Sequence, residues 1–403
     1  MSAPVPKEFH LVVACCRWPP SEQRNEAIRA AAADVSDWAR FLRIVRHHRV
    51  AGLARDGLRQ AAICVPAETA GKLHEDATAL VRQNLQFVSE SVRLQTTLNN
   101  LDIPNLFVKG IPLAQLAYGG LSVKHSWDID LLVTPKTVTR AIAALMELGY
   151  FASPPLPSET DPRYQHWIKY SREYIFTHKT KNLPVELHWR LTDNEHFLQG
   201  VSAETGGQIV IVPGENPLRT LNDDDLFSYL SIHGAFHGWA RLKWLADVAA
   251  LISGESADVL ERRFETARRA NADHCVAQAF LLCHRLFDVQ ALSALSKRLR
   301  RRWRYRYLEK MAFDTMSAGG GEVMPGASSF DMTSVYFSHF LVGHGFRYVT
   351  SELRNKLQGP YDLLYSEGKP RSGFLYPARR MIAWLRRGGR TRNAVESAKR
   401  RAD

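Results

Sequence analysis

The chain has 403 residues, of which 45% are hydrophobic and 23% are charged, a composition typical of a folded protein with a sizeable core. Its five cysteines include no Cys-X-X-Cys pair, and no apolar run reaches about eighteen residues, which argues against a disulfide framework and a membrane-spanning helix. The N-terminus does not resemble a secretory signal, so we expect a cytoplasmic protein with reduced thiols.

The formal net charge of +12 is concentrated near the C-terminus. Residues 297–310 hold eight Lys or Arg against one Glu, and residues 371–403 hold ten Lys or Arg against two acids. These two segments account for more than the whole net charge, so the rest of the chain is close to neutral. The basic character is a property of two local segments.

Residues 1–100 are expected to be helical. Apolar residues recur at three- and four-residue spacing over residues 21–62, with a break near Gly52 and Gly57. Pro66 is suited to the first turn of another helix, which we expect to run on to residue 100.

The pattern changes over residues 101–220, for which we predict an α+β fold with a small mixed sheet. A helix is expected from Pro135 to residue 148, because Pro favours a helix start and Gly149 follows its end. Residues 153–162 read as a Pro/Ser-rich loop. The predicted strands are residues 105–108, 129–133, 174–178 and 185–191. A polar turn between the last two is typical of a hairpin.

Residues 221–358 are again expected to be helical, and residues 359–403 form a basic tail. Asn222 or Asp223 is suited to cap a helix that runs to about residue 253. The remaining predicted helices lie within residues 257–310 and 331–357. The predicted architecture is a small mixed-sheet catalytic core flanked by N-terminal and C-terminal helical regions.

The segment Asp128-Ile129-Asp130 begins the most informative strand. Side chains alternate between the two faces of a strand, so Asp128 and Asp130 project to one side and Ile129 faces the core. Adjacent carboxylates repel each other unless a cation lies between them, and Mg²⁺ prefers such oxygen ligands. On its own, however, such a pair more often marks two acids at a strand edge.

Two neighbouring segments favour the metal hypothesis. Lys109-Gly110 follows a predicted strand and precedes a helix, and a glycine turn at a helix N-terminus favours phosphate binding. Glu186 lies on a separate predicted strand and supplies a third carboxylate that could reach the same site. Ions bound by these acids would polarise a triphosphate and activate an attacking hydroxyl.

These segments resemble those of a known family. The residues that carry the resemblance are Lys109-Gly110 with Leu113-Ala114 and Tyr118, the run Lys124-His125-Ser126-Trp127-Asp128-Ile129-Asp130-Leu131-Leu132-Val133, and Glu186-Leu187-His188-Trp189-Arg190. Together with residues 233–247, they resemble the polymerase-β-type nucleotidyltransferases, and most closely their bacterial uncharacterised nucleotidyltransferase branch. The resemblance covers roughly residues 85–290.

The resemblance implies a metal-dependent enzyme that moves a nucleoside monophosphate from a nucleoside triphosphate to an acceptor. Asp128 and Asp130 would bind two Mg²⁺ ions, with Mn²⁺ as an alternative, and Glu186 would help to hold the ion that activates the acceptor hydroxyl. Lys109 and Gly110 would hold phosphates. The pathways associated with the branch suggest a small molecule, sugar or peptide as the acceptor.

Two positions depart from the pattern of this branch. Lys124, expected to assist phosphate binding, stands where Arg is common, and an ammonium lacks the bidentate fork of a guanidinium. Trp127 stands where Gly is common, and its bulk could narrow the nucleotide pocket. The alternative functions are transfer of a different phosphate-linked group, or a degenerate module that binds a nucleotide or nucleic acid without turnover.

His233, His237 and Arg241 recur at four-residue spacing, so we expect them on one face of the helix predicted from residue 223. That face could close over the cleft, with Arg241 or Lys243 on phosphates and His237 near the acceptor. Buried packing histidines are an equally weighted alternative, and a zinc site is a third one.

The basic segments suggest two further interactions. Residues 300–307 interleave Arg with Trp and Tyr, a pattern suited to a nucleic-acid backbone or to a solvated helix with inward-facing rings. Residues 377–390 mix apolar side chains with arginines and could contact an anionic membrane surface. Nucleic acid is not the favoured partner, because the positive charge lies away from the catalytic segment in the sequence.

Overall fold

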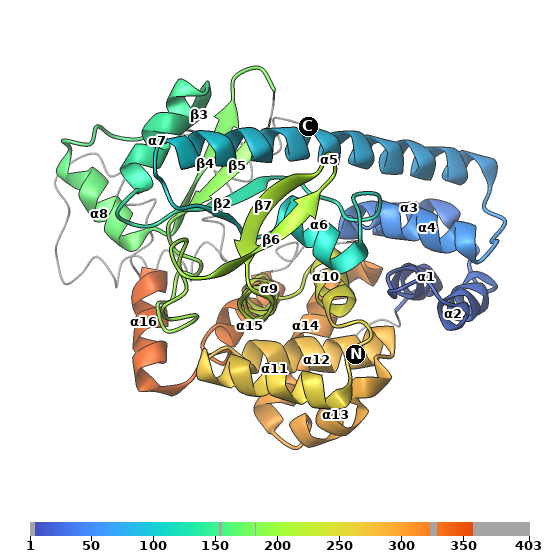
Figure 1. The fold of residues 1–403 in the computed structure, drawn as a ribbon. Helices are drawn as coiled ribbons and strands as arrows, with labels where there is room; N and C mark the ends of the chain where they lie inside the picture. Colours follow the sequence, from blue (N-terminus) through green and yellow to red (C-terminus); the bar gives the residue numbers. More distant parts are fainter. Residues whose placement is uncertain (1–4, 153–154, 182, 323–328, 358–403) are drawn as a thin grey trace.

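The computed structural model describes residues 5–152, 155–181, 183–322 and 329–357 (Figure 1). The predicted basic tail, including its candidate membrane-contacting segment, lies outside these residues. Within them, no helix combines the length and the apolar character needed to cross a membrane.

The N-terminal region is helical, as predicted. Its helices are α1 (Lys7–Cys15), α2 (Glu22–Ala32), α3 (Trp38–His48), α4 (Ala51–Gln60) and α5 (Ala67–Asn100). Helix α5 begins directly after Pro66 and ends at the predicted residue. It packs on α3 and α4 at one end and on the strands at the other (Figure 1).

The predicted break near Gly52 and Gly57 is wrong, because both glycines lie inside α4. The chain breaks instead at Arg49, whose backbone is left-handed with φ 56°. Gly52 is needed for close packing, since a Cβ there would lie 2.6 Å from the Cα of Val123. Because glycine has no Cβ, the loop at Val123 can pack directly against the helix.

A five-stranded mixed sheet forms the centre of residues 101–220, which confirms the prediction of a small mixed sheet there. Its strands are β1 (Leu106–Phe107), β2 (Ile129–Leu132), β3 (Tyr150–Ala152), β4 (Glu173–His178) and β5 (Pro184–His188). The strand order is β1-β2-β5-β4-β3, in which only the β2–β5 pair is parallel. The predicted hairpin is the antiparallel pair β4–β5.

Two helices connect these strands. Helix α6 (Gly110–Tyr118) leads from β1 towards β2, and α7 (Val138–Glu147) leads from β2 to β3. Helix α7 starts three residues after Pro135, and Gly149 follows it with φ 92°. The observed ends of the predicted strands and of α7 thus lie within a few residues of the predicted ends.

Four elements of this region were not predicted. They are strand β3, helix α8 (Pro162–Tyr170), and strands β6 (Gly207–Val212) and β7 (Asn216–Leu221). Helix α8 is fixed by Trp167, which is fully buried against Tyr174 and Trp189. Strands β6 and β7 form a separate hairpin held on α5, where the Gln95 side chain donates to the Pro217 carbonyl at 2.7 Å.

The C-terminal region is helical, as predicted. Its α-helices are α9 (Asp223–Phe236), α10 (Leu242–Leu251), α11 (Ala257–Arg269), α12 (Asp273–Phe287), α13 (Ser293–Leu299), α14 (Trp303–Met316), α15 (Ser329–Ser338) and α16 (Gly345–Leu357). Asn222 caps α9 by accepting from the Asp225 amide at 2.9 Å.

The prediction of one helix from residue 223 to about residue 253 is wrong. Helix α9 ends at Phe236, and Gly238 and Trp239 follow with left-handed backbones (φ 59° and 52°). The Trp239 ring is fully buried and folds back over Gly234, where a Cβ would lie 2.4 Å from it. Burial of this large ring accompanies the reversal between α9 and α10.

The two helical regions share one hydrophobic core, which contains residues of α1, α3 and α4 together with residues of α9 to α14. A second core surrounds the five-stranded sheet and includes residues of α5, α7 and α8. The sheet therefore lies against a helical body to which both ends of the described chain contribute (Figure 1). The domain boundaries drawn from the sequence remain a prediction.

Candidate active site

Two paired strands bring acidic side chains together. In the parallel register of β2 and β5, Asp130 lies opposite Glu186. Ile129 and Leu131 are buried in the sheet core, so the alternation expected for this strand holds. Asp128 directly precedes β2 and lines the same cleft as Asp130.

Lys109 forms a buried ion pair with the second acid, with its Nζ 2.7 Å from Oδ1 of Asp130. Burial favours the neutral form of this lysine, but the Asp130 carboxylate outweighs that effect and holds the pKa of Lys109 well above its ordinary value. Asp128 and Glu186 act in the same direction. Lys109 is therefore a permanent positive charge at the acidic cluster.

The helix after Lys109 offers a place for an anion. Gly110 is the first residue of α6, and its φ of 63° is a backbone conformation that favours glycine. Both Lys109 and Gly110 line the cleft. The unpaired amides of a first helical turn attract anions, so this arrangement is suited to a phosphate group.

His188 is a site residue that the sequence did not single out. Its Nε2 lies 3.3 Å from Oδ1 of Asp130, and its Nδ1 lies 3.1 Å from Oε2 of Glu173. Burial would lower the pKa of His188, but Glu173 and Asp130 raise it to about 9. His188 is therefore an imidazolium that joins the two acids at neutral pH.

A sequence signal for His188 existed. It stands two residues after Glu186 on one strand and so shares its face. The role of Glu173 was not visible in the same way, because it depends on the pairing of Glu173 with His188 across β4 and β5. Glu173 also pairs with Arg172 at 3.1 Å, and its pKa is lowered despite burial, chiefly by Arg172 and then by His188.

The donor set fits a divalent cation. Ligand atoms of Asp130, Glu186 and His188 all lie within 4.8 Å of one another. Asp128 does not belong to this tight group, although it lines the cleft beside Asp130. Carboxylate oxygens suit Mg²⁺ or Mn²⁺, and Lys109 and His188 supply the positive charge that otherwise balances Asp130.

Lys124 lies in the cleft but is held by a buried ion pair. Its Nζ lies 2.7 Å from Oδ2 of Asp247, and Oδ1 of the same carboxylate accepts from the Tyr118 hydroxyl at 2.9 Å. Asp247 therefore neutralises Lys124 inside the protein. A phosphate would have to compete with this carboxylate for the ammonium.

Lys243 lies on the same wall of the cleft, at the start of α10. Burial lowers its pKa to about 7, and the positive charges of Lys124 and Arg49 contribute to the shift. Its charge therefore changes near neutral pH, in contrast to that of Lys109.

His233, His237 and Arg241 do not share a helical face, because α9 ends before His237. His233 lines the cleft, and burial together with Lys109 lowers its pKa well below the ordinary value. The His237 ring stacks on Trp244 with 4.8 Å between ring centroids. Arg241 precedes α10 and donates to the His47 carbonyl at 2.8 Å.

Trp127 borders the cleft next to the first acid. The Arg49 guanidinium lies 4.1 Å from its ring centroid, and the His125 ring lies 5.1 Å away. The cleft encloses only about 30 Å³. Trp127 is one of the residues that line this small cleft, and its narrowing effect on a nucleotide pocket stays a prediction.

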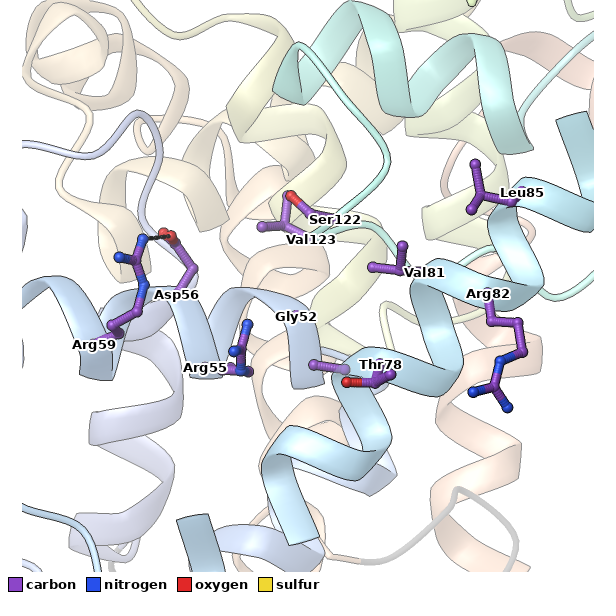
Figure 2. Close-up of a pocket in the computed structure, with 11 residues that line it drawn as sticks. Gly52, Arg55, Asp56, Arg59, Thr78, Val81, Arg82, Leu85, Ser122 and Val123 are labelled. Carbon is purple, nitrogen blue, oxygen red and sulfur yellow. Dashed lines mark ion pairs between the residues drawn. The ribbon is translucent and has the colours of Figure 1, made fainter. Parts of the chain in front are cut away.

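A wider cavity of about 730 Å³ lies between α4 and α5 (Figure 2). Figure 2 shows Arg55 and Arg59 on α4 and Arg82 on α5 around it. The cavity shares no lining residue with the cleft, although Ser122 and Val123 on its wall continue directly into the cleft segment. The larger cavity is therefore separate from the cleft that holds the acidic residues.

The basic residues 297–310 cover the end of α13, the connection at residues 300–302 and the start of α14. Both helices pack on α12. Arg298 pairs with Glu261, and Arg300 pairs with Glu309 at 2.7 Å. Trp303 is 61% exposed, whereas Tyr305 is buried. None of these residues lines the acidic cleft.

The fold and the site together define a nucleotidyltransferase-type core with helical flanks. A family model described as an uncharacterised nucleotidyltransferase matches residues 34–288, which is more than half of the chain. The chain therefore belongs to the uncharacterised nucleotidyltransferase family, as the sequence resemblance implied. This membership supports a general nucleotidyltransfer activity. A comparison with curated proteins finds no match.

Proposed function

We propose that this chain is a metal-dependent nucleotidyltransferase that moves a nucleoside monophosphate from a nucleoside triphosphate to an acceptor hydroxyl or phosphate. The observation that carries the proposal is the register that sets Asp130 of β2 opposite Glu186 of β5, in the cleft that Asp128 also lines. Family membership supports the reaction class.

Asp128, Asp130 and Glu186 are the residues that would hold two Mg²⁺ ions, or Mn²⁺ in their place. When bound, such ions neutralise a triphosphate and make an acceptor hydroxyl easier to deprotonate. Glu186 would accept the proton of that hydroxyl. The acceptor oxygen then forms a bond to the α-phosphorus, and the bond from that phosphorus to pyrophosphate breaks.

The cationic side chains of the cleft have separate tasks in this proposal. Lys109 and the first turn of α6 hold phosphate oxygens, because both are positive and both line the cleft. Lys243 adds a charge that is present below about pH 7. His188 orients Asp130 through the 3.3 Å hydrogen bond.

A bound triphosphate requires the cleft to widen. Pockets for drug-sized ligands typically enclose about 300–1,000 Å³, compared with about 30 Å³ here. Trp127 and Trp244 both line the cleft, so a movement of their rings would widen it. They would then offer aromatic faces to a nucleobase.

We propose a small molecule, sugar or peptide as the acceptor. A nucleic acid is disfavoured because residues 297–310 do not line the cleft and part of their charge is paired with Glu261 and Glu309.

The direct test is metal-dependent release of pyrophosphate from each of the four nucleoside triphosphates, with a cell extract as a source of acceptors. We expect release with Mg²⁺ or Mn²⁺, and its loss in the double variant Asp128→Ala/Asp130→Ala. Arg82→Ala, in the separate cavity of Figure 2, is the matched control and should retain activity. Release that persists in the double variant would rule out these acids as the catalytic site.

One observation favours a second candidate, a module that binds a nucleotide without turnover. Lys109 already balances Asp130 at 2.7 Å and so reduces the need for a metal there. Metal-independent nucleotide binding without pyrophosphate release would support this candidate. Metal-dependent transfer of another phosphate-linked group, identified by mass spectrometry of the product, would instead support a transferase with a different donor.

A further inference from the structure

Three potential metal ligands lie close together in space. They come from parts of the sequence other than those that form the acidic cleft. Asp273 and His274 are the first two residues of α12, and His344 directly precedes α16. One ligand atom of each lies within 4.8 Å of the other two. None of the three lines the acidic cleft.

The three side chains differ in their access to solvent. Asp273 is 2% exposed and His274 is 3% exposed, so their polar atoms are held inside the protein. The His344 side chain is 40% exposed and opens the cluster to solvent. An ion from solution can therefore reach the two buried groups beside His344.

The remaining polar atoms of the buried ligands are already occupied. The Nδ1 of His274 donates to the Leu341 carbonyl at 2.7 Å, which leaves Nε2 with a free lone pair. The Tyr305 hydroxyl lies 3.4 Å from Oδ2 of Asp273, which leaves Oδ1 for another partner. Metal-binding histidines commonly donate their second nitrogen to a carbonyl, and metal-binding carboxylates accept further hydrogen bonds.

The third ligand is already directed at the other two. His344 Nε2 is hydrogen-bonded to Oδ1 of Asp273, and the His274 and His344 rings lie with their centroids 3.9 Å apart. The His344 ring thus contacts the Asp273 carboxylate, and the His274 ring lies beside the His344 ring. A divalent ion would replace the single shared proton of the Asp273–His344 hydrogen bond.

We propose that Asp273, His274 and His344 form a binding site for a borderline divalent cation such as Zn²⁺, separate from the acidic cleft. Two imidazole nitrogens and one carboxylate oxygen match the ligand preference of Zn²⁺ and leave a fourth position for water. Mg²⁺ prefers an all-oxygen set and is not the expected ion.

The ion would join two parts of the chain that are far apart in sequence (Figure 1). Helix α16 also contacts the segment that follows β5, where Asn194 Nδ2 lies 3.2 Å from Glu352 and the Phe197 ring packs on Tyr348. A bond from the start of α16 to the start of α12 would fix this helix to the helical body. Because the ion binds only the folded arrangement, it should raise the melting temperature.

The test uses the untagged full-length chain, freed of metal with a chelator, in the Asp128→Ala/Asp130→Ala background to weaken ion binding in the cleft. Zn²⁺ binding is followed by calorimetry and thermal unfolding, and Co²⁺ binding by visible absorbance. We expect one Zn²⁺ per chain, a higher melting temperature with Zn²⁺, and the absorbance of a Co²⁺–imidazole complex.

His344→Ala is the informative variant, because its partly exposed side chain can be removed with little effect on packing. It should weaken Zn²⁺ binding by about tenfold or more and abolish the Co²⁺ absorbance. His284→Ala, on the same helix α12, is the matched histidine control and should bind as the parent does. Asp273→Asn, which keeps the shape of the carboxylate, should behave like His344→Ala.

Two results would overturn the proposal. The first is a parent chain that binds no Zn²⁺ and gives no Co²⁺ absorbance. The second is a His344→Ala chain that binds Zn²⁺ as tightly as the parent. In the second case His344→Ala would lower the melting temperature equally with and without Zn²⁺, and the cluster would be a hydrogen-bonded helix contact only.

Discussion

Asp130 and Glu186 lie opposite each other in the one parallel strand pair of the central sheet. They are 56 positions apart in the sequence, and α7, β3, α8 and β4 lie between them. The adjacent His188 and Lys109 both contact Asp130, so the acid is balanced by cations from two further positions.

Glu186→Gln should abolish most of the transferase activity while the chain stays folded. The amide cannot accept the proton of an acceptor hydroxyl and binds a cation less well than a carboxylate does. We expect kcat to fall by about 10²–10⁴-fold, measured as pyrophosphate release. Glu204→Gln, at an exposed position, should be unchanged. An active Glu186→Gln chain would remove Glu186 from the catalytic group.

Asp247→Ala should destabilise the protein because it leaves the Lys124 ammonium buried without its partner. Breaking a buried ion pair on one side typically costs about 3–5 kcal/mol. The double variant Asp247→Ala/Lys124→Met should recover part of this loss, as measured by urea unfolding. Asp76→Ala removes the partly exposed Arg46–Asp76 pair and should cost about 0–1 kcal/mol. Equal losses in Asp247→Ala and the double variant would contradict the coupling.

Lys243 should make stability depend on pH above neutrality. Its pKa is about 7 in the folded chain and lies near the ordinary lysine value in the unfolded chain. Between these values the unfolded chain binds the extra proton, so the free energy of unfolding should rise as pH increases from 7 to 9. Lys243→Met should lose this contribution, which can be measured as the difference between the two unfolding curves. Parallel pH profiles would show that Lys243 titrates normally.

Gly234→Ala and Gly71→Ala should change stability in opposite directions. A Cβ at Gly234 would lie 2.4 Å from the buried Trp239 ring, and such overpacking typically costs about 1–3 kcal/mol. A Cβ at Gly71 meets nothing within 4 Å on helix α5, so alanine should stabilise by about 0.5–1 kcal/mol. Thermal unfolding distinguishes the two. A tolerated Gly234→Ala would mean that Trp239 can move away from α9.

Where a glycine ends a helix cannot be predicted from its sequence neighbours alone. In the sequence Gly52 and Gly57 look like helix breaks, yet both lie inside α4, because the loop at Val123 and the side chains around Gly57 pack against them. Similarly, the spacing of His233, His237 and Arg241 fits one helical face. Burial of Trp239 is accompanied by a chain reversal that separates them.

The sequence by itself determined the local elements and the chemistry they carry. Alternation placed Ile129 in the core and Asp130 in the cleft, and the glycine after Lys109 predicted the start of α6. The motifs also identified the family. Each of these features depends on neighbours within a few residues, where backbone geometry and side-chain alternation decide the outcome.

Only the tertiary structure decided which charges meet. Lys124 pairs with Asp247, and His188 lies between Asp130 and Glu173. His344 contacts Asp273 at the start of α12. Such contacts depend on strand register and helix packing between distant segments, and buried charges are stable only where those arrangements supply a partner. The chemical groups are therefore visible in the sequence, whereas their pairing is a property of the fold.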